Sequence, residues 1–206
     1  MKRSFENWLW EDLEIEFGLS QTMLPELDIW LNGVVMVTDK EREQLNALSH
    51  NFNKYYKNWN EDELKMQFIA PLLIIIDYYT SAYMPFSQRN LSVVVKNWEI
   101  SGRVDWMLSK GKQTPRKPYF FLHEYKREVS SEGDPQGQLL AEMFAAQQLN
   151  QDNLPVYGCY VVGKDWTFMV LKDLNYAVSR PYQANEAPDL DVIFKALKQI
   201  KTLLPL

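Results

Sequence analysis

The spacing of apolar residues predicts that the first third of the chain is helical. Short helices are expected over residues 5–17 and 23–32, with a turn at Gly18 between them. A longer helix is expected from Thr38 to Trp59, because apolar residues recur there at steps of three and four. The residues that repeat in this way are Leu45, Leu48, Phe52, Tyr55 and Trp59.

A further helix begins at Asn60 and carries apolar residues at helical spacing as far as Tyr79. Pro71 lies inside this pattern. Proline lacks an amide hydrogen, and its ring clashes with the preceding turn. We therefore expect the helix to kink or split at Pro71.

After Tyr83 the apolar period changes from helical to two, which predicts strands. A strand over residues 91–95 is followed by a turn at 96–98, a returning strand over 99–108 and a third strand over 119–125. Strict alternation divides the second of these strands into two faces. Val104, Trp106 and Leu108 fall on one face, and Arg103, Asp105 and Met107 fall on the other.

The last part of the chain predicts a helix, a hairpin and a final helix. Asp134-Pro135 combines a helix cap with a first-turn proline, and that helix should run to about Asn150. Strands over 156–162 and 166–171 form the hairpin, and residues 192–203 form the last helix. This order predicts an α/β fold with a mixed central sheet flanked by helices. It is expected to be one domain, with an N-terminal helical segment (1–59) packed on an α/β core (60–206).

Composition narrows the class of protein only modestly. The chain has 206 residues and a formal net charge of −5, which argues against a bulk basic nucleic-acid coat protein but not against an enzyme with local basic residues. The single cysteine, Cys159, lies in an apolar run and is expected to be a buried, inert thiol. The N-terminus lacks the apolar core of a signal peptide, and the apolar run Ile69–Ile76 is too short to span a bilayer. We expect a cytoplasmic protein.

Three ionisable residues stand in the predicted sheet where a purely structural sheet would not need them. Asp105 interrupts the second strand, and Glu124 and Lys126 close the third. Glu124 and Lys126 are two residues apart in an extended segment, so they project to the same side. Two carboxylates from adjacent strands, with a lysine beside them, are typical of a site for a hard divalent cation and a bound water.

A structural explanation of the same residues is an ion pair. Asp105 could pair with Arg103, and Glu124 with Lys126, at the end of a sheet. The apolar run Tyr119–Leu122 indicates, however, that the third strand is buried on both faces, where charges are costly unless they are compensated. Two carboxylates and one lysine leave about one negative charge, which a cation would neutralise.

The segments Gly102-Arg103-Val104-Asp105 and Glu124-Tyr125-Lys126 resemble the PD-(D/E)XK restriction-endonuclease-like superfamily. The resemblance extends over roughly residues 60–172, although Val104 stands where that motif has a proline. It implies a restriction-endonuclease-like fold with extra N-terminal helices, in which Asp105 and Glu124 bind Mg²⁺ (or Mn²⁺). It also implies that Lys126 orients the attacking water and that the Tyr125 carbonyl is a further ligand.

The resemblance assigns two more site residues, and each has a structural alternative. Glu63 would add a metal contact from the helix before the sheet, but Asn60-x-x-Glu63 is also a capping-box pattern. Gln138, or Gln136, would support the site from the helix after the third strand, or simply hydrogen-bond in its first turn. His123 projects opposite to Glu124 and is expected to be a packed residue.

The segment between the second and third strands is basic and has no acidic residue. It contributes Lys110, Lys112, Arg116 and Lys117, which beside such a site would bind phosphates. The sequence therefore predicts a metal-dependent nuclease that acts on nucleic acid, with DNA as the expected substrate. A homodimer is compatible with this function. Two alternatives are a catalytically silent module that binds nucleic acid or a partner protein, and a structural protein whose charged residues are ion pairs.

Overall fold

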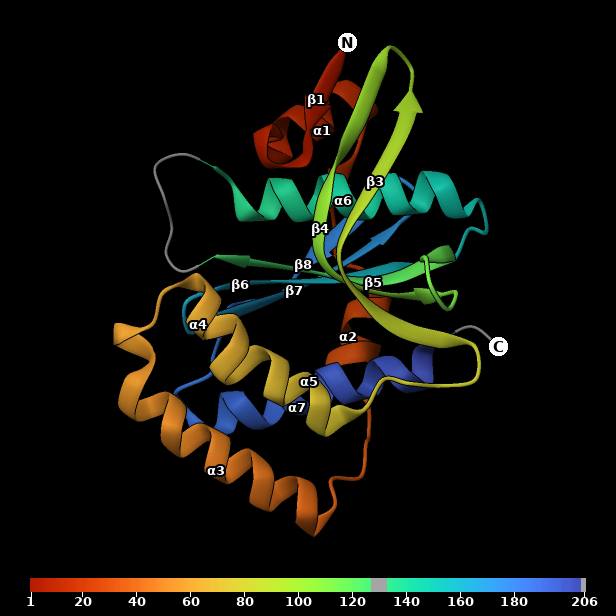
Figure 1. Ribbon diagram of the computed structural model, residues 1–206. Helices are drawn as coiled ribbons and strands as arrows, with labels where there is room; N and C mark the ends of the chain where they lie inside the picture. The colour runs from red at the N-terminus through yellow and green to blue at the C-terminus, as the bar shows by residue number, and fades with distance from the viewer. Residues whose placement is uncertain (127–132, 205–206) are drawn as a thin grey trace.

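The computed structural model shows three layers, with one mixed sheet between two layers of helices (Figure 1). The structure describes residues 1–126 and 133–204, and the side chains at positions 118, 120, 122 and 124 lie outside this description. The predicted α/β architecture with a mixed, helix-flanked sheet is confirmed at this level. None of the helices in the described ranges is both long and apolar enough to cross a membrane.

The sheet is built around a parallel pair, β5 and β6, with antiparallel strands on each side. Its main path runs β1-β4-β5-β6-β7-β8-β2, and β3 pairs with β4 while β9 pairs with β7. The strands are β1 (Lys2–Ser4), β2 (Ser20–Gln21), β3 (Tyr83–Val95), β4 (Trp98–Lys110), β5 (Arg116–Lys126), β6 (Val156–Val162), β7 (Asp165–Lys172), β8 (Asn175–Val178) and β9 (Tyr182–Gln183).

The strands of the predicted hairpins are present, and four short strands were not predicted. β3 begins at Tyr83, earlier than the apolar alternation indicates, because four exposed residues, 87–90, interrupt the alternation in the middle of the strand. β1, β2, β8 and β9 contain only two to four residues each, too few for a period to be read. β1 and β2 bring the N-terminal segment into the sheet beside β4 and β8.

One face of the sheet is covered by five helices around a single apolar cluster. Trp30 is completely buried at its centre, where its indole nitrogen donates a hydrogen bond of 2.7 Å to the Ala196 carbonyl. Thr38, which the sequence offers as a cap alongside Asp39, caps the helix Asp39–Tyr55 by accepting a hydrogen bond from the Glu41 amide. The helices are α2 (Pro25–Leu31), α3 (Asp39–Tyr55), α4 (Glu61–Leu64), α5 (Ala70–Ile76) and α7 (Ala187–Leu203).

The opposite face carries α6 (Pro135–Asn150), which lies between the sheet and α1 (Trp10–Phe17) (Figure 1). Asp134 caps α6 as predicted, accepting from the Gln136 amide, and its other oxygen accepts from the Trp10 amide. Gly137 makes this close approach possible, since a Cβ there would lie 2.4 Å from the Trp8 carbonyl oxygen. Residues 137–146 are all buried, so α6 is a central helix.

The helix predicted from Asn60 is split, as Pro71 indicated. A π-helical turn, Lys65–Ile69, separates α4 from α5, and Pro71 lies in the first turn of α5. The wider turn leaves space for the proline ring. Because Pro71 stands in the first turn of α5, its missing amide hydrogen removes no hydrogen bond within that helix. Lys65 is the first residue of this turn, which places its side chain beside the sheet.

The pairing of β3 with β4 is interrupted at one position. Ser87 pairs with Trp106 and Arg89 pairs with Val104, but Gln88 and Asp105 between them do not join the ladder, and Gln88 has a φ of 55°. The face assignment from strict alternation is therefore wrong here. Val104 packs with Met107 on the α6 face, whereas Trp106 and Leu108 pack on the other.

Candidate functional site

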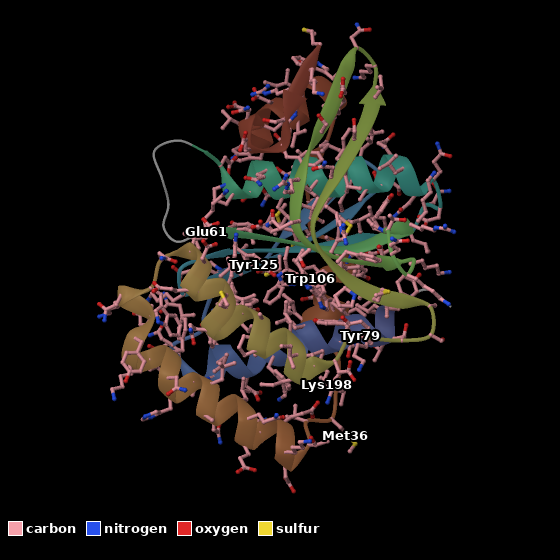
Figure 2. All side chains as sticks on the ribbon, viewed as in Figure 1. Met36, Glu61, Tyr79, Trp106, Tyr125 and Lys198 are labelled. Atoms are coloured by element: carbon pink, nitrogen blue, oxygen red, sulfur yellow. The ribbon has the colours of Figure 1, made fainter. Side chains whose placement is uncertain are left out.

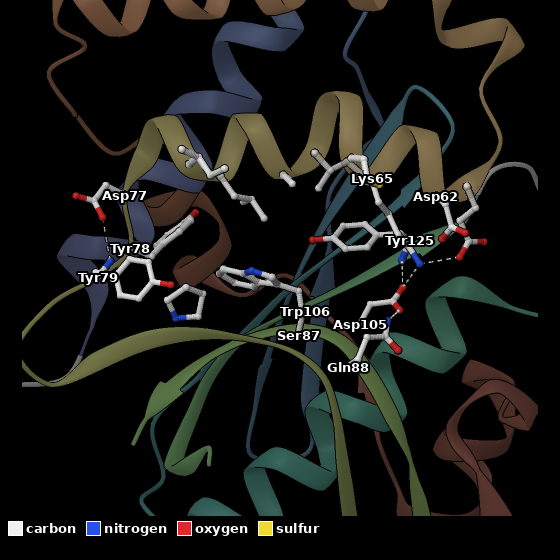
Figure 3. A pocket seen from close by; sticks show the side chains of 17 residues that line it. Asp62, Lys65, Asp77, Tyr78, Tyr79, Ser87, Gln88, Asp105, Trp106 and Tyr125 are labelled. Atoms are coloured by element: carbon white, nitrogen blue, oxygen red, sulfur yellow. Dashed lines mark hydrogen bonds and ion pairs between the residues drawn. The ribbon is translucent and has the colours of Figure 1, made fainter. Parts of the chain in front are cut away.

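Asp105 opens onto a groove between the sheet and the helical segment Glu61–Ile76. The groove has a volume of about 1030 Å³ and runs from Asp62 and Asp105 at one end to Asp77 and Tyr79 at the other (Figure 3). The interrupted pairing of β4 turns both Asp105 and Trp106 toward it. The side chain of Asp105 is 14% exposed, so its carboxylate is sheltered but reachable.

Asp105 is held by neighbours on both adjacent strands. Its Oδ1 accepts a hydrogen bond of 2.6 Å from the Gln88 side-chain amide, and its Oδ2 accepts one of 3.2 Å from the backbone amide of Tyr125. The second bond joins Asp105 to the residue between Glu124 and Lys126. The structure thus brings the predicted aspartate directly against the predicted Glu-x-Lys segment of β5.

The ammonium group nearest Asp105 among the described contacts belongs to Lys65. Its Nζ lies 3.2 Å from Asp105 Oδ2 and 2.7 Å from Glu61 Oε1 (Figure 3). Burial by itself lowers the pKa of Lys65, but the hydrogen bond that Lys65 donates to Glu61 and the negative charge of Asp105 outweigh it, so the pKa is raised above its ordinary value. Lys65 is therefore a cation clamped between two carboxylates.

Sequence reasoning missed both Lys65 and Gln88. The four-residue step from Glu61 to Lys65 predicts an ion pair along a helix, but it does not say that the pair faces a strand. Gln88 reaches Asp105 because its backbone adopts a positive φ. Glutamine is not a residue type that favours positive φ, so the sequence did not indicate this conformation.

The positions of Glu124 and Lys126 are described in part. Glu124 lies in β5 opposite Tyr160 of β6, and its side chain lies outside the described residues. Lys126 is partly buried, pairs with Val162, and its carbonyl accepts a hydrogen bond of 2.9 Å from the Gly163 amide. The convergence of both side chains on Asp105, and the ligand role of the Tyr125 carbonyl, stay predictions.

Glu63 forms the capping box. Its Oε2 accepts a hydrogen bond of 2.7 Å from the Asn60 amide, and Asn60 Oδ1 accepts one of 2.8 Å from the Glu63 amide. The structural alternative for this residue is therefore observed, and Glu63 is exposed outside the groove. Glu61 and Asp62 are the acidic residues of this turn that line the groove.

Gln138 lies on α6, on the side of the sheet opposite to Lys65. It is almost fully buried, and its Nε2 donates a hydrogen bond of 3.4 Å to Oε1 of Glu142, which is itself fully buried. Glu142 lies one helical turn after Gln138. It was not singled out from the sequence, because α6 is buried all round and its apolar pattern does not show which polar residues are inside. The buried amide and carboxylate form a polar pair inside the α6 layer.

His123 and Cys159 are packed residues, as predicted. His123 is completely buried among the rings of Trp106, Phe121 and Trp166, and neither ring nitrogen has a hydrogen-bond partner among the described residues. Burial lowers the pKa of His123 to about 3. Burial also raises the pKa of the Cys159 thiol well above its ordinary value.

The basic segment lies at the far end of the β4–β5 pair from Asp105. Lys112 is in the connecting turn, Arg116 and Lys117 begin β5, and all three are exposed. Lys110 places its ammonium 5.4 Å from the centre of the Tyr83 ring. Lys110 lies five residue steps along β4 from Asp105, a distance of about 16 Å. The basic segment is therefore not in contact with the Asp105 carboxylate.

The chemistry of Asp105 fits a hard cation. A carboxylate has about four acceptor positions, and Asp105 contacts the Gln88 amide, the Tyr125 amide and the Lys65 ammonium. Carboxylate oxygens are also the ligands that hard divalent cations prefer. No group of three or more histidine, cysteine, aspartate or glutamate side chains able to hold a metal occurs within the described part of the chain, which leaves out the side chain of Glu124. A complete ligand set would require Glu124. Searches against protein-family models and against curated proteins found no match for this chain.

Proposed function

We propose that the chain is a restriction-endonuclease-like, metal-dependent nuclease that hydrolyses phosphodiester bonds of nucleic acid. The observation that supports this proposal best is the hydrogen bond from the Tyr125 amide to Asp105 Oδ2. It fastens an aspartate of β4 to the middle of Glu124-Tyr125-Lys126. Such contact is what a site shared between these two strands requires.

In this proposal Asp105 and Glu124 hold Mg²⁺ or Mn²⁺ with their carboxylate oxygens, and the Tyr125 carbonyl is a further ligand. The ion would stabilise charge on the scissile phosphate and lower the pKa of a bound water. Gln88 orients the Asp105 carboxylate through Oδ1, and the Tyr125 amide orients it through Oδ2. These bonds keep the oxygens in place before a substrate arrives.

Two lysines have different roles in this proposal. Lys126 positions and polarises the attacking water. Lys65, held 3.2 Å from Asp105, balances the negative charge of Glu61 and Asp105 when no cation is bound. Entry of a cation would therefore displace the Lys65 ammonium from Oδ2 or share that oxygen with it.

The second candidate function is a catalytically silent module that binds nucleic acid or a partner protein. The Lys65 ion pair favours it, because a lysine already neutralises Asp105 without any cation. The two functions differ in a simple assay. Nicking of plasmid DNA with Mg²⁺ or Mn²⁺ that EDTA stops, and that Asp105→Asn abolishes, supports the nuclease. Binding without cleavage under every divalent metal supports the silent module.

A further inference from the structure

The groove beside Asp105 has an apolar wall that nothing in the described part of the chain covers. Met66, Ala70 and Ile74 follow one another at four-residue steps along the helical segment, and all three are exposed. The side chains of Met66 and Ile74 are 73% and 75% exposed, and Tyr79 at the end of the wall is 65% exposed. Apolar side chains aligned in this way mark a surface that a partner covers.

The floor of the groove is rigid and aromatic. Trp106 and Tyr125 come from the sheet, Tyr78 follows α5, and all three are buried (Figures 2 and 3). The Tyr78 hydroxyl donates a hydrogen bond of 2.8 Å to the Leu197 carbonyl, which fixes that ring to α7. A preformed apolar floor lowers the ordering cost of binding.

Both ends of the groove are acidic. Glu61, Asp62 and Asp105 lie at one end and Asp77 at the other, and among the described residues that line the groove Lys65 is the single basic one. The Lys65 ammonium is already bound by Glu61 and Asp105. The lining therefore carries a net negative charge, which favours a cationic occupant as long as no divalent cation is bound.

The separation of the two ends indicates a peptide rather than a small molecule. Asp62 and Asp77 are fifteen residues apart along the helical segment, which corresponds to about 22 Å. A helix of about fifteen residues spans that distance. A second copy of this chain is a poor occupant, because two molecules with a formal charge of −5 each repel one another.

We propose that this groove binds an amphipathic helix of a partner protein, with apolar residues along one face and a lysine or arginine near each end. The apolar face would lie on Met66, Ala70 and Ile74, as in other helix-in-groove complexes. The basic residues would meet Asp77 at one end and Asp62 at the other. This interaction needs neither cleavage nor a divalent cation.

The test uses the full chain and a synthetic eighteen-residue helical peptide with leucines at positions i, i+4, i+7 and i+11 and two lysines at each end. Calorimetric titration in EDTA should show saturable binding. The same peptide with glutamates in place of the lysines should bind at least tenfold more weakly. The variant Ile74→Glu should lose at least tenfold in affinity for the lysine peptide.

The matched control is Val94→Glu, because Val94 is 73% exposed at the tip of the β3–β4 hairpin, away from the groove. It should bind the peptide like the wild type, and circular dichroism should show both variants folded. Equal binding of the two peptides, no binding of either, or unchanged binding by Ile74→Glu would overturn the proposal. A wild-type dimer that Ile74→Glu dissociates in light scattering would overturn it in favour of a second copy. The peptide titration is done in EDTA, whereas the cleavage assay needs Mg²⁺ or Mn²⁺. A failure to bind the peptide therefore does not count against the nuclease proposal, and a failure to cleave does not count against the peptide proposal.

Discussion

The ammonium of Lys65 lies 3.2 Å from Oδ2 of Asp105, and the same ammonium lies 2.7 Å from Oε1 of Glu61. Lys65 belongs to a helical turn and Asp105 to a strand forty residues later, so the contact ties the two walls of the groove together. The three charges sum to about −1. This arrangement either stabilises the fold as an ion pair or holds the Asp105 carboxylate in place for a cation.

The stability of this ion pair can be measured with a double-mutant cycle. We expect Lys65→Met to lower the free energy of unfolding by about 1–2 kcal/mol, because it leaves the sheltered Asp105 without its cation. Asp105→Asn should lower it by less, because Lys65 keeps its ion pair with Glu61. The double variant should recover part of that loss. The exposed pair Lys2–Glu99 is the control, and its disruption should give no measurable change in urea unfolding. Additive losses in the Lys65–Asp105 cycle would contradict the coupling.

One conservative substitution, Glu63→Gln, distinguishes a capping role of Glu63 from a metal-binding role. Glu63→Gln should leave both thermal stability and any metal-dependent cleavage unchanged, because glutamine also completes a capping box. Asn60→Ala should lower the free energy of unfolding by about 1 kcal/mol, since it removes the oxygen that accepts from the Glu63 amide. Loss of cleavage in a stable Glu63→Gln protein would instead identify Glu63 as a ligand.

His123 should make the protein sensitive to acid. Its folded pKa of about 3 lies below the ordinary value of 6.5, so between these values the unfolded chain binds a proton that the folded chain does not. The free energy of unfolding should fall by about 1.4 kcal/mol for each pH unit below 6.5, and the loss should level off near pH 3. His123→Leu should remove this slope in urea unfolding at pH 4.5 relative to pH 7.5. Substitution of His50, which is exposed on α3, is the control and should retain the slope.

The nuclease proposal predicts different losses for different residues. Lys126→Ala should lower the cleavage rate by about 10²–10³ while binding of nucleic acid largely survives, because the lysine is assigned to the transition state. Asp105→Asn should abolish the gain in melting temperature that Mg²⁺ or Mn²⁺ gives the wild type. Metal-independent melting of both proteins, together with no cleavage, would support the ion-pair explanation.

The basic segment should govern binding rather than cleavage. Replacing Lys112, Arg116 and Lys117 by alanine should weaken binding to duplex DNA and flatten its dependence on salt, because each lost phosphate contact releases about one counterion fewer. The stability of the protein should not change, because these side chains are exposed. Fluorescence anisotropy measures the affinity of the wild type and of the variant for DNA at salt concentrations from about 50 to about 200 mM. An unchanged salt slope would show that the nucleic acid binds elsewhere.

Local signals predicted most of the fold. The helical apolar period, the cap at Asp134 and the break near Pro71 act within a few residues along the chain, and they appear in the structure where the sequence indicates them. The period of two located the main strands but failed at Val104 and Asp105. The capping box at Glu63 and the burial of His123 and Cys159 were also readable, because burial follows from an apolar neighbourhood. Short strands such as β1 and β9 were not, because two or three residues carry no period.

The sequence by itself determined which residue types stand in the two strands of the site: Asp105 in one, and Glu124 and Lys126 in the other. Only the tertiary structure decided what surrounds them. The positive φ of Gln88 breaks the alternation of β4 at Asp105, and the π-helical turn brings Lys65 across from a different part of the chain. Both depend on packing between segments that are distant in sequence. The free energy of such contacts is shared among many residues, so no local pattern records it.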